Sequence, residues 1–323
     1  MVSRMSREFY GQLAPDLTRG KKPLEEFIEI MEDEWEGYRV KEEKLTGVYP
    51  KEKIQRDLEQ VEEKKDSLAG QSRPKESIAA EYLLLEAISN HLLFNRKNQE
   101  ADINLIPAAE FDDYFNGIDI IVAARMKGEK NWHYIGIDAT TSEDEGELMK
   151  KLSANYRKIT SIKQLPKADY YLPQTENKGE KPGSVNLIRI VLGLSQKRVR
   201  DLAAEYVDSK GKNVFKPSDQ LELIQETIDQ IMITIEQTAN RFKDKRYSDY
   251  VFADPKRALD FAEQYGQREN ADPAISKILQ EHAEILEYFL NLQKEKSPLG
   301  EINPERTHER QFRLLAPKKS LAA

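Results

Sequence analysis

Two stretches decide the fold of this chain: Ile118-Asp119-Ile120-Ile121-Val122 and Trp132-His133-Tyr134-Ile135-Gly136-Ile137-Asp138. Both are rich in the β-branched and aromatic residues that favour strands. The segment Lys127-Gly128-Glu129-Lys130 between them has the length and composition of a hairpin connection. The sequence therefore predicts a β-hairpin at this point.

The apolar residues of the hairpin predict how its strands pair. With the turn centred between Gly128 and Glu129, one face becomes wholly apolar. Its pairs are Ile118 with Ala139, Ile120 with Ile137, and Val122 with Ile135. A shift by one residue would move these side chains to opposite faces. The same register places Asp119 opposite Asp138, where paired Cβ atoms lie about 4.5–5.5 Å apart.

Two carboxylates held this close on a half-buried face predict a proton or a cation between them, because like charges there destabilise a sheet. Hard oxygen ligands suit Mg²⁺ or Mn²⁺. We expect Glu81 as a third ligand, because it shares a helix face with apolar residues and charged side chains are rarely buried alone. A separation above about 10 Å from both aspartates would exclude Glu81, since Mg²⁺ needs ligands at ~2.0–2.1 Å.

Two alternatives to this interpretation concern the acidic residues. Asp119 and Asp138 could lie at strand ends in water and contact nothing. Asp112 and Asp113, which precede the first strand of the hairpin, could add a ligand, but a turn or capping role is favoured.

The surrounding elements indicate a mixed α/β layer with helical extensions. Helices are expected over 23–45, 54–68, 76–95 and 143–162, and further strands over 103–107 and 185–194. We expect a helical N-terminal arm at 1–72, an α/β core at 73–200, a helical C-terminal region at 201–296 and a tail at 297–323.

The C-terminal region carries apolar residues at alternating steps of three and four: Leu221, Ile224, Ile228, Ile231, Ile235, Thr238 and Phe242. Such a seam packs either within the chain or against a second copy. Intrachain packing is favoured, and a homodimer through the C-terminal helices is the alternative.

The composition excludes several classes of protein. The chain has no cysteine, which rules out disulfides, thiolate zinc sites and cysteine nucleophiles. Its apolar runs fall short of the ~20 residues of a membrane helix, and no secretory signal is recognisable, so we expect a cytoplasmic protein without a membrane partner. The net charge of −7 argues weakly against a nucleic-acid partner.

A local run of positive charge argues for such a partner, because the local field attracts phosphate. Residues 150–167 hold six basic side chains and no acid. The nucleic-acid-binding residues expected within this run are Lys150, Lys151, Arg157, Lys158 and Lys163. The alternative is a solvated helix face.

These residues carry a family resemblance. A Glu in a first helix, an Asp in a second strand, and an acid two residues before a catalytic group in a third strand form the motif of the PD-(D/E)XK nuclease superfamily. Glu81, Asp119 and Asp138-Ala139-Thr140 resemble it, over about a third of the chain. The chain also resembles a group of bacterial proteins without an assigned activity, which share the residue patterns at 112–119 and 137–142.

The resemblance implies an αβββαβ restriction-endonuclease-like core and metal-assisted phosphodiester hydrolysis of DNA, with RNA as the other substrate class. Asp119, Asp138 and Glu81 would hold one or two Mg²⁺ ions. The catalytic lysine of the family belongs where Thr140 stands, so Lys150 or Lys151 of the following helix would replace it. The alternative is a non-catalytic nucleic-acid-binding or assembly protein on a degenerate nuclease scaffold.

Overall fold

A computed structural model describes residues 22–38, 40, 42–69, 73–89, 101–126, 132–141, 150–151, 153–154, 165–173, 181–211, 214–241, 254–268 and 271–296. Contacts group these residues into two compact units. The first takes in the described residues of Met1–Asn95, Gln99–Ser142 and Lys167–Ser218, and the second those of Arg96–Asn98, Glu143–Pro166 and Asp219–Ala323. The boundaries expected at residues 72, 200 and 296 stay a prediction.

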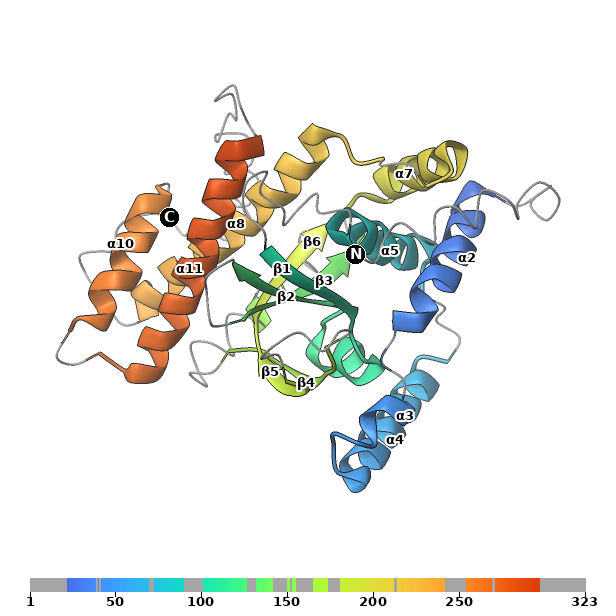
Figure 1. The fold of residues 1–323 in the computed structure, drawn as a ribbon, viewed down its shortest axis with the longest axis horizontal. Helices are drawn as coiled ribbons and strands as arrows, with labels where there is room; N and C mark the ends of the chain where they lie inside the picture. Colours follow the sequence, from blue (N-terminus) through green and yellow to red (C-terminus); the bar gives the residue numbers. More distant parts are fainter. Residues whose placement is uncertain are drawn as a thin grey trace, which may run out of the picture. The chain divides into compact units, whose positions relative to one another are not determined.

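A four-stranded mixed sheet forms the centre of the first unit, so the chain is a mixed α/β protein (Figure 1). Its strands are β1 (Ala101–Pro107), β2 (Ile120–Met126), β3 (His133–Thr140) and β6 (Ile188–Gly193), in the order β1-β2-β3-β6. The first three are antiparallel, and β6 runs parallel to β3. The strand expected over 185–194 is divided: β5 (Gly183–Asn186) ends first and pairs with β4 (Lys167–Tyr171) in a second, two-stranded sheet.

The predicted hairpin register is confirmed from Ile120 to Ala124, with Ile120 opposite Ile137 and Val122 opposite Ile135. The ladder becomes irregular one residue earlier. The backbone N–H of Asp119 donates to the carbonyl oxygen of Ile137 at 2.8 Å, so Asp119 and Ile120 both oppose Ile137. Two residues opposite one is the arrangement of a β-bulge, which breaks the alternation of faces.

The bulge makes two predictions wrong. Asp119 was expected opposite Asp138, but it opposes Ile137. Ile118 was expected on the face of Ile120, but it packs in the cluster that contains Ile121 and Ala123. A Cβ at Gly136 would lie 3.3 Å from Ile118 Cγ2, which also places Ile118 on the face of Gly136. The extra residue in the bulge is the physical reason, because it reverses the side from which preceding side chains project.

Three helices form a layer on one side of the sheet: α5 (Lys75–Ser89), α2 (Pro23–Trp35) and α7 (Gln196–Ser209), which contact one another (Figure 1). Helix α5 is the innermost and contacts β3 and β1. The predicted helix 23–45 is wrong in its length, because α2 ends at Trp35. It is followed by the 3₁₀ turn η1 (Glu36–Tyr38) and by α3 (Glu42–Leu45). Gly37, a poor helix former, lies at this break.

The other face of the sheet is covered by the small β4–β5 sheet, where Ile121 and Ala123 pack against Ala168 and Tyr171. The short π-helical turn η2 (Asp112–Asn116) holds β4 in place. The buried carboxylate of Asp112 accepts hydrogen bonds from the backbone N–H groups of Asp169 at 2.7 Å and Tyr170 at 2.9 Å. Asp112 therefore has a structural role between η2 and β4.

Helix α4 (Lys51–Ser67) confirms the helix expected from Ile54 to Leu68, although it begins earlier and ends one residue sooner. It bonds to the same strand. Tyr170 Oη donates to Asp57 Oδ2 at 2.7 Å, and Tyr49, just before α4, accepts a hydrogen bond from the N–H of Tyr171 at 2.8 Å. These bonds attach α4 to the edge of the first unit.

The second unit contains α8 (Pro217–Arg241), α10 (Pro255–Gly266) and α11 (Pro273–Lys296), of which α10 and α11 pack together. Five residues of the predicted seam are buried within one copy of the chain: Ile224, Ile228, Ile231, Ile235 and Thr238. Phe242 lies outside the described residues, and the homodimer remains a prediction. Over the described residues, every helix is too short or too polar to cross a membrane.

Candidate functional site

Three carboxylates of the first unit surround the guanidinium group of Arg73. Its Nη2 lies 3.1 Å from Glu81 Oε2 and 3.4 Å from Asp119 Oδ1. Its Nη1 lies 3.6 Å from Asp113 Oδ2. The three acids come from α5, from the bulge before β2, and from η2. We call Glu81, Asp113 and Asp119 the acidic cluster.

Local structure explains why these side chains meet. Arg73 precedes Pro74, whose carbonyl oxygen accepts the N–H of Ser77 at 2.9 Å as α5 begins. Arg73 therefore lies about two helical turns before Glu81, and its guanidinium contacts the Glu81 carboxylate. The bulge aims the Asp119 side chain along β3, where its Oδ2 accepts the N–H of Ala139 at 2.7 Å.

Burial sets the charge state of the cluster. Burial raises the pKa of Asp119 well above its ordinary value, and the charges of Asp113 and Asp138 raise it further, while Arg73 opposes them. Burial likewise raises the pKa of Asp113, again opposed by Arg73. Although burial alone would lower the pKa of Arg73, the three surrounding carboxylates raise it, so its guanidinium remains a cation.

Asp138 has a cation of its own. Arg189 Nη2 donates to Asp138 Oδ2, and both side chains are buried. The parallel pairing of β3 with β6 sets Arg189 beside Gly136, two residues from Asp138 and therefore on the same face. Gly117 leaves room for this guanidinium: its φ is +62°, and a Cβ there would lie 3.0 Å from Arg189 Cζ and closer still to Nη2.

The predicted three-carboxylate site meets its distance criterion for Glu81. Glu81 and Asp119 contact the same nitrogen of Arg73 at 3.1 Å and 3.4 Å, so their oxygens lie no further apart than the sum of these distances. The alternative that the aspartates lie in water is wrong, because Asp119 and Asp138 are 6% and 3% exposed. The two are electrostatic neighbours, but each binds a different arginine.

The remaining predicted residues are placed as follows. Thr140 is buried at the end of β3, where its carbonyl oxygen accepts the N–H of Leu194 at 3.0 Å. Lys150 and Lys151 are helical and belong to the second unit. The other three basic residues of the predicted nucleic-acid surface, at 157, 158 and 163, lie outside the described residues.

Sequence reasoning missed Arg73 and Arg189 and underestimated Asp113. Arg73 lies in a stretch rich in helix breakers, which is typical of a loop. Arg189 did carry a signal, because a charge between Ile188 and Ile190 in a buried strand requires a partner. Asp112 and Asp113 are neighbours in the sequence, and the fold of η2 decides that Asp113 meets Arg73 whereas Asp112 meets β4.

No three Asp, Glu, His or Cys side chains in the described part of the chain could hold a metal ion as they stand. In the acidic cluster, the guanidinium of Arg73 lies between the carboxylates instead.

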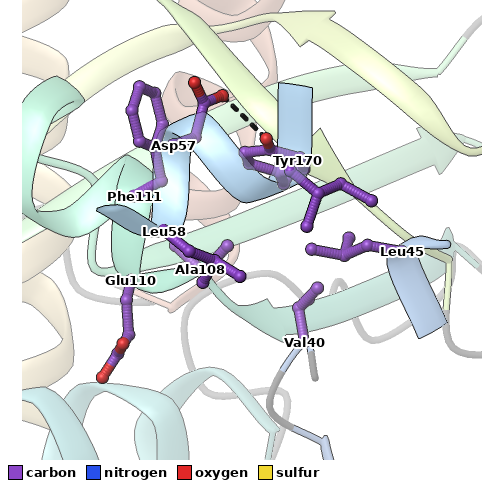
Figure 2. Close-up of a pocket in the computed structure, with 10 residues that line it drawn as sticks. Val40, Leu45, Asp57, Leu58, Ala108, Glu110, Phe111 and Tyr170 are labelled. Carbon is purple, nitrogen blue, oxygen red and sulfur yellow. Dashed lines mark hydrogen bonds between the residues drawn. The ribbon is translucent and has the colours of Figure 1, made fainter. Parts of the chain in front are cut away.

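A separate cavity of about 330 Å³ lies in the first unit between α4 and the segment before η2 (Figure 2). Most of its wall is apolar: Val40, Leu45, Ile54, Leu58, Ala108, Ala109 and Phe111. Asp57 at its edge is already bonded to Tyr170 at 2.7 Å and to Lys53 at 2.6 Å. The Asp57 and Tyr170 side chains at this cavity are thus occupied by bonds that hold α4. The acidic cluster is therefore a stronger candidate site than the cavity.

Comparison of the chain with protein-family models, with curated proteins and with solved structures found no match. The chemistry of the acidic cluster itself therefore carries the functional argument.

Proposed function

We propose that the first unit contains a restriction-endonuclease-like αβββαβ core and that the protein is a Mg²⁺- or Mn²⁺-dependent nuclease that hydrolyses phosphodiester bonds of DNA, with RNA as the other substrate class. The observation that carries this proposal is the convergence of Glu81, Asp113 and Asp119 on one cationic group. The order α5, β1, β2, β3 and β6 supports the core, although most of the helix expected before β6 lies outside the described residues.

The donor chemistry of the cluster fits a divalent metal, whereas its spacing fits a guanidinium. Carboxylate oxygens are the hard ligands that Mg²⁺ and Mn²⁺ prefer. Asp119 and Glu81 would hold the metal, with Asp138 as the third ligand that the resemblance implies and Asp113 as an additional one. A metal bound there would lower the pKa of a coordinated water and would offset negative charge on the phosphate.

The chain's own residues contribute orientation and charge. The N–H of Ala139 fixes the direction of the Asp119 carboxylate, and Arg189 fixes that of Asp138. Such preorganisation spares the reorganisation that would otherwise slow the reaction. Thr140 cannot supply the positive charge of a lysine, and Arg73 is the cation that the described residues bring to the cluster. Lys197 and Arg200, exposed on α7, add basic surface to the first unit.

A second candidate function is a non-catalytic nucleic-acid-binding or assembly protein. A specific observation favours it: Arg73 and Arg189 already neutralise the buried acids, so the fold does not need a metal to hold them. Threonine in place of the family's lysine points the same way.

Cleavage of single- and double-stranded DNA with Mg²⁺ or Mn²⁺ separates the two functions. We expect the wild type to cleave, and Asp119→Ala and Asp138→Ala to lose cleavage. Asp57→Asn, which alters a buried acid outside the cluster, should retain it. Cleavage that survives both alanine substitutions would reject the site. A wild type that neither cleaves nor gains thermal stability from either metal would favour the second function.

A further inference from the structure

The cavity of about 330 Å³ beside α4 is large for a gap between packed side chains (Figure 2). Folded proteins leave few spaces larger than one water molecule, whose share of liquid volume is about 30 Å³. Pockets that bind small molecules measure about 300–1,000 Å³ and have mainly apolar walls. The volume and the apolar wall of this cavity therefore fit a ligand site.

Polar bonds fix the spacing between the two sides of the cavity. Helix α4 lies on one side, and β4 and the segment before η2 lie on the other. Tyr170 Oη donates to Asp57 Oδ2 at 2.7 Å, and Lys65 Nζ lies 2.9 Å from Glu110 Oε2. Both bonds join α4 to the opposite side, so an inward movement of α4 would break them. The cavity is thus a built part of the first unit.

The charged side chains of the wall already have partners. Asp57 also binds Lys53 at 2.6 Å and Arg56 at 3.1 Å, and the Glu110 carboxylate points away from the other labelled side chains in Figure 2. Lys53 Nζ lies 4.1 Å from the centroid of the Tyr170 ring, so a cationic ligand would meet a cation already bound to this ring. An ion of either sign would lose its hydration at an apolar wall. The site therefore favours an uncharged molecule.

Two aromatic rings form a corner of the wall. The ring centroids of Phe111 and Tyr170 lie 5.9 Å apart, and the ring planes meet at 85°. Aromatic rings prefer edge-to-face or offset contacts with centroids about 4.5–7 Å apart, so a third ring can pack into this corner. Phe111 and Leu58 are only partly buried, which leaves the cavity open to a ligand from solvent.

We propose that this cavity binds a small uncharged aromatic molecule, which packs against Phe111 and Tyr170 between α4 and the segment before η2. The inference goes beyond the proposed nuclease function and does not depend on it, because the residues of the acidic cluster do not line the cavity. Cleavage of DNA and binding of the aromatic ligand can therefore fail separately.

The first test titrates the full-length chain with N-phenyl-1-naphthylamine, an uncharged aromatic dye whose fluorescence rises in apolar surroundings. We expect saturable binding with a dissociation constant on the order of 10 µM, as the size of such a ligand allows. Naphthalene should displace the dye. Naphthalene-1-sulfonate adds a charge to the same rings and should need about tenfold higher concentration. Equal displacement by both compounds would overturn the uncharged ligand class.

The second test fills the cavity. Ala109→Leu adds a larger apolar side chain to the wall and should weaken dye binding by about tenfold or more, because packed interiors yield little. Ala69→Leu is the matched control, since it adds the same atoms at an exposed position just after α4, and it should bind the dye as the wild type does. Near-ultraviolet circular dichroism shows whether each variant is folded. Wild-type affinity in folded Ala109→Leu would overturn the proposal.

If Ala109→Leu does not fold, Leu58→Trp decides the question. Leu58 is partly buried, so the larger ring has solvent to relax into while it narrows the cavity. Wild-type affinity in that variant would equally reject the site.

Hydrogen exchange of the wild type locates the ligand without any substitution. Naphthalene should slow exchange in α4 and in residues 108–111 and leave α7 unchanged. Protection of α7 without protection of α4 would place the ligand elsewhere and overturn the inference. Absence of saturable dye binding by the wild type would do the same.

Discussion

Gly117→Ala tests whether the buried pair of Arg189 with Asp138 depends on a missing side chain. Gly117 follows η2 with φ 62° and ψ 48°, a left-handed conformation. An alanine there costs about 1–2 kcal/mol in the folded state. The loss of flexibility in the unfolded chain offsets about 0.4–1 kcal/mol of this.

The larger effect comes from the new methyl group. It would lie 3.0 Å from Arg189 Cζ and closer to Nη2, whereas carbon atoms in contact lie about 3.5–4.0 Å apart. The guanidinium must therefore move away from Asp138. Loss of one partner from a buried ion pair costs about 3–5 kcal/mol, which sets an upper limit here because Arg189 is displaced and not removed. We expect a total loss of about 2–5 kcal/mol in the free energy of unfolding.

Urea unfolding followed by tryptophan fluorescence measures this loss in the relevant unit, because Trp35 and Trp132, the two tryptophans of the chain, both belong to the first unit. Gly47→Ala is the matched control: a Cβ there meets nothing within 4 Å, so its effect should stay within about 0.5 kcal/mol.

Gly117→Asn separates the two causes, because asparagine tolerates the left-handed conformation but adds the same Cβ. It should remain destabilised relative to the wild type. Wild-type stability in Gly117→Ala, or full recovery in Gly117→Asn, would refute the argument that Arg189 needs this space.

Three further predictions concern groups outside the acidic cluster. Burial raises the pKa of Asp112 from 3.8 to about 6, so the folded state holds a proton that the unfolded state releases. The stability of the first unit should thus fall by roughly 3 kcal/mol as pH rises from about 4 to 6, a slope absent from Asp112→Asn in urea unfolding. Burial lowers the pKa of His282 from 6.5 to about 4, so its contribution to stability changes with pH in the opposite direction. The second unit should lose roughly 3 kcal/mol of stability as pH falls from 6.5 to about 4. Hydrogen exchange in α11 should become faster over this range, and His282→Gln should not show the change. Tyr49→Phe leaves the buried N–H of Tyr171 without its acceptor and should cost about 1–3 kcal/mol in urea unfolding; an unchanged midpoint would contradict the role of this bond.

The sequence by itself determined the elements whose information is local. Alternating β-branched residues around a short turn predicted the hairpin, and matching the two apolar faces predicted its register from Ile120 to Ala124. Both follow from the two-residue period of a strand, which any reader of the sequence can count. The buried stripe that includes Glu81 was likewise readable from helical spacing.

Only the tertiary structure decided which cations these acids meet. Arg73 and Asp119 are 46 residues apart, and Arg189 and Asp138 are 51 residues apart, so no local period relates them. The bulge at Asp119 depends on β3, and it turned a predicted facing pair of aspartates into two separate ion pairs. A buried acid pairs with the cation that the folded backbone brings near it, so the fold as a whole decides the pairing. The two aspartates that the sequence singled out are buried as expected, and their two arginine partners are the contribution of the three-dimensional structure.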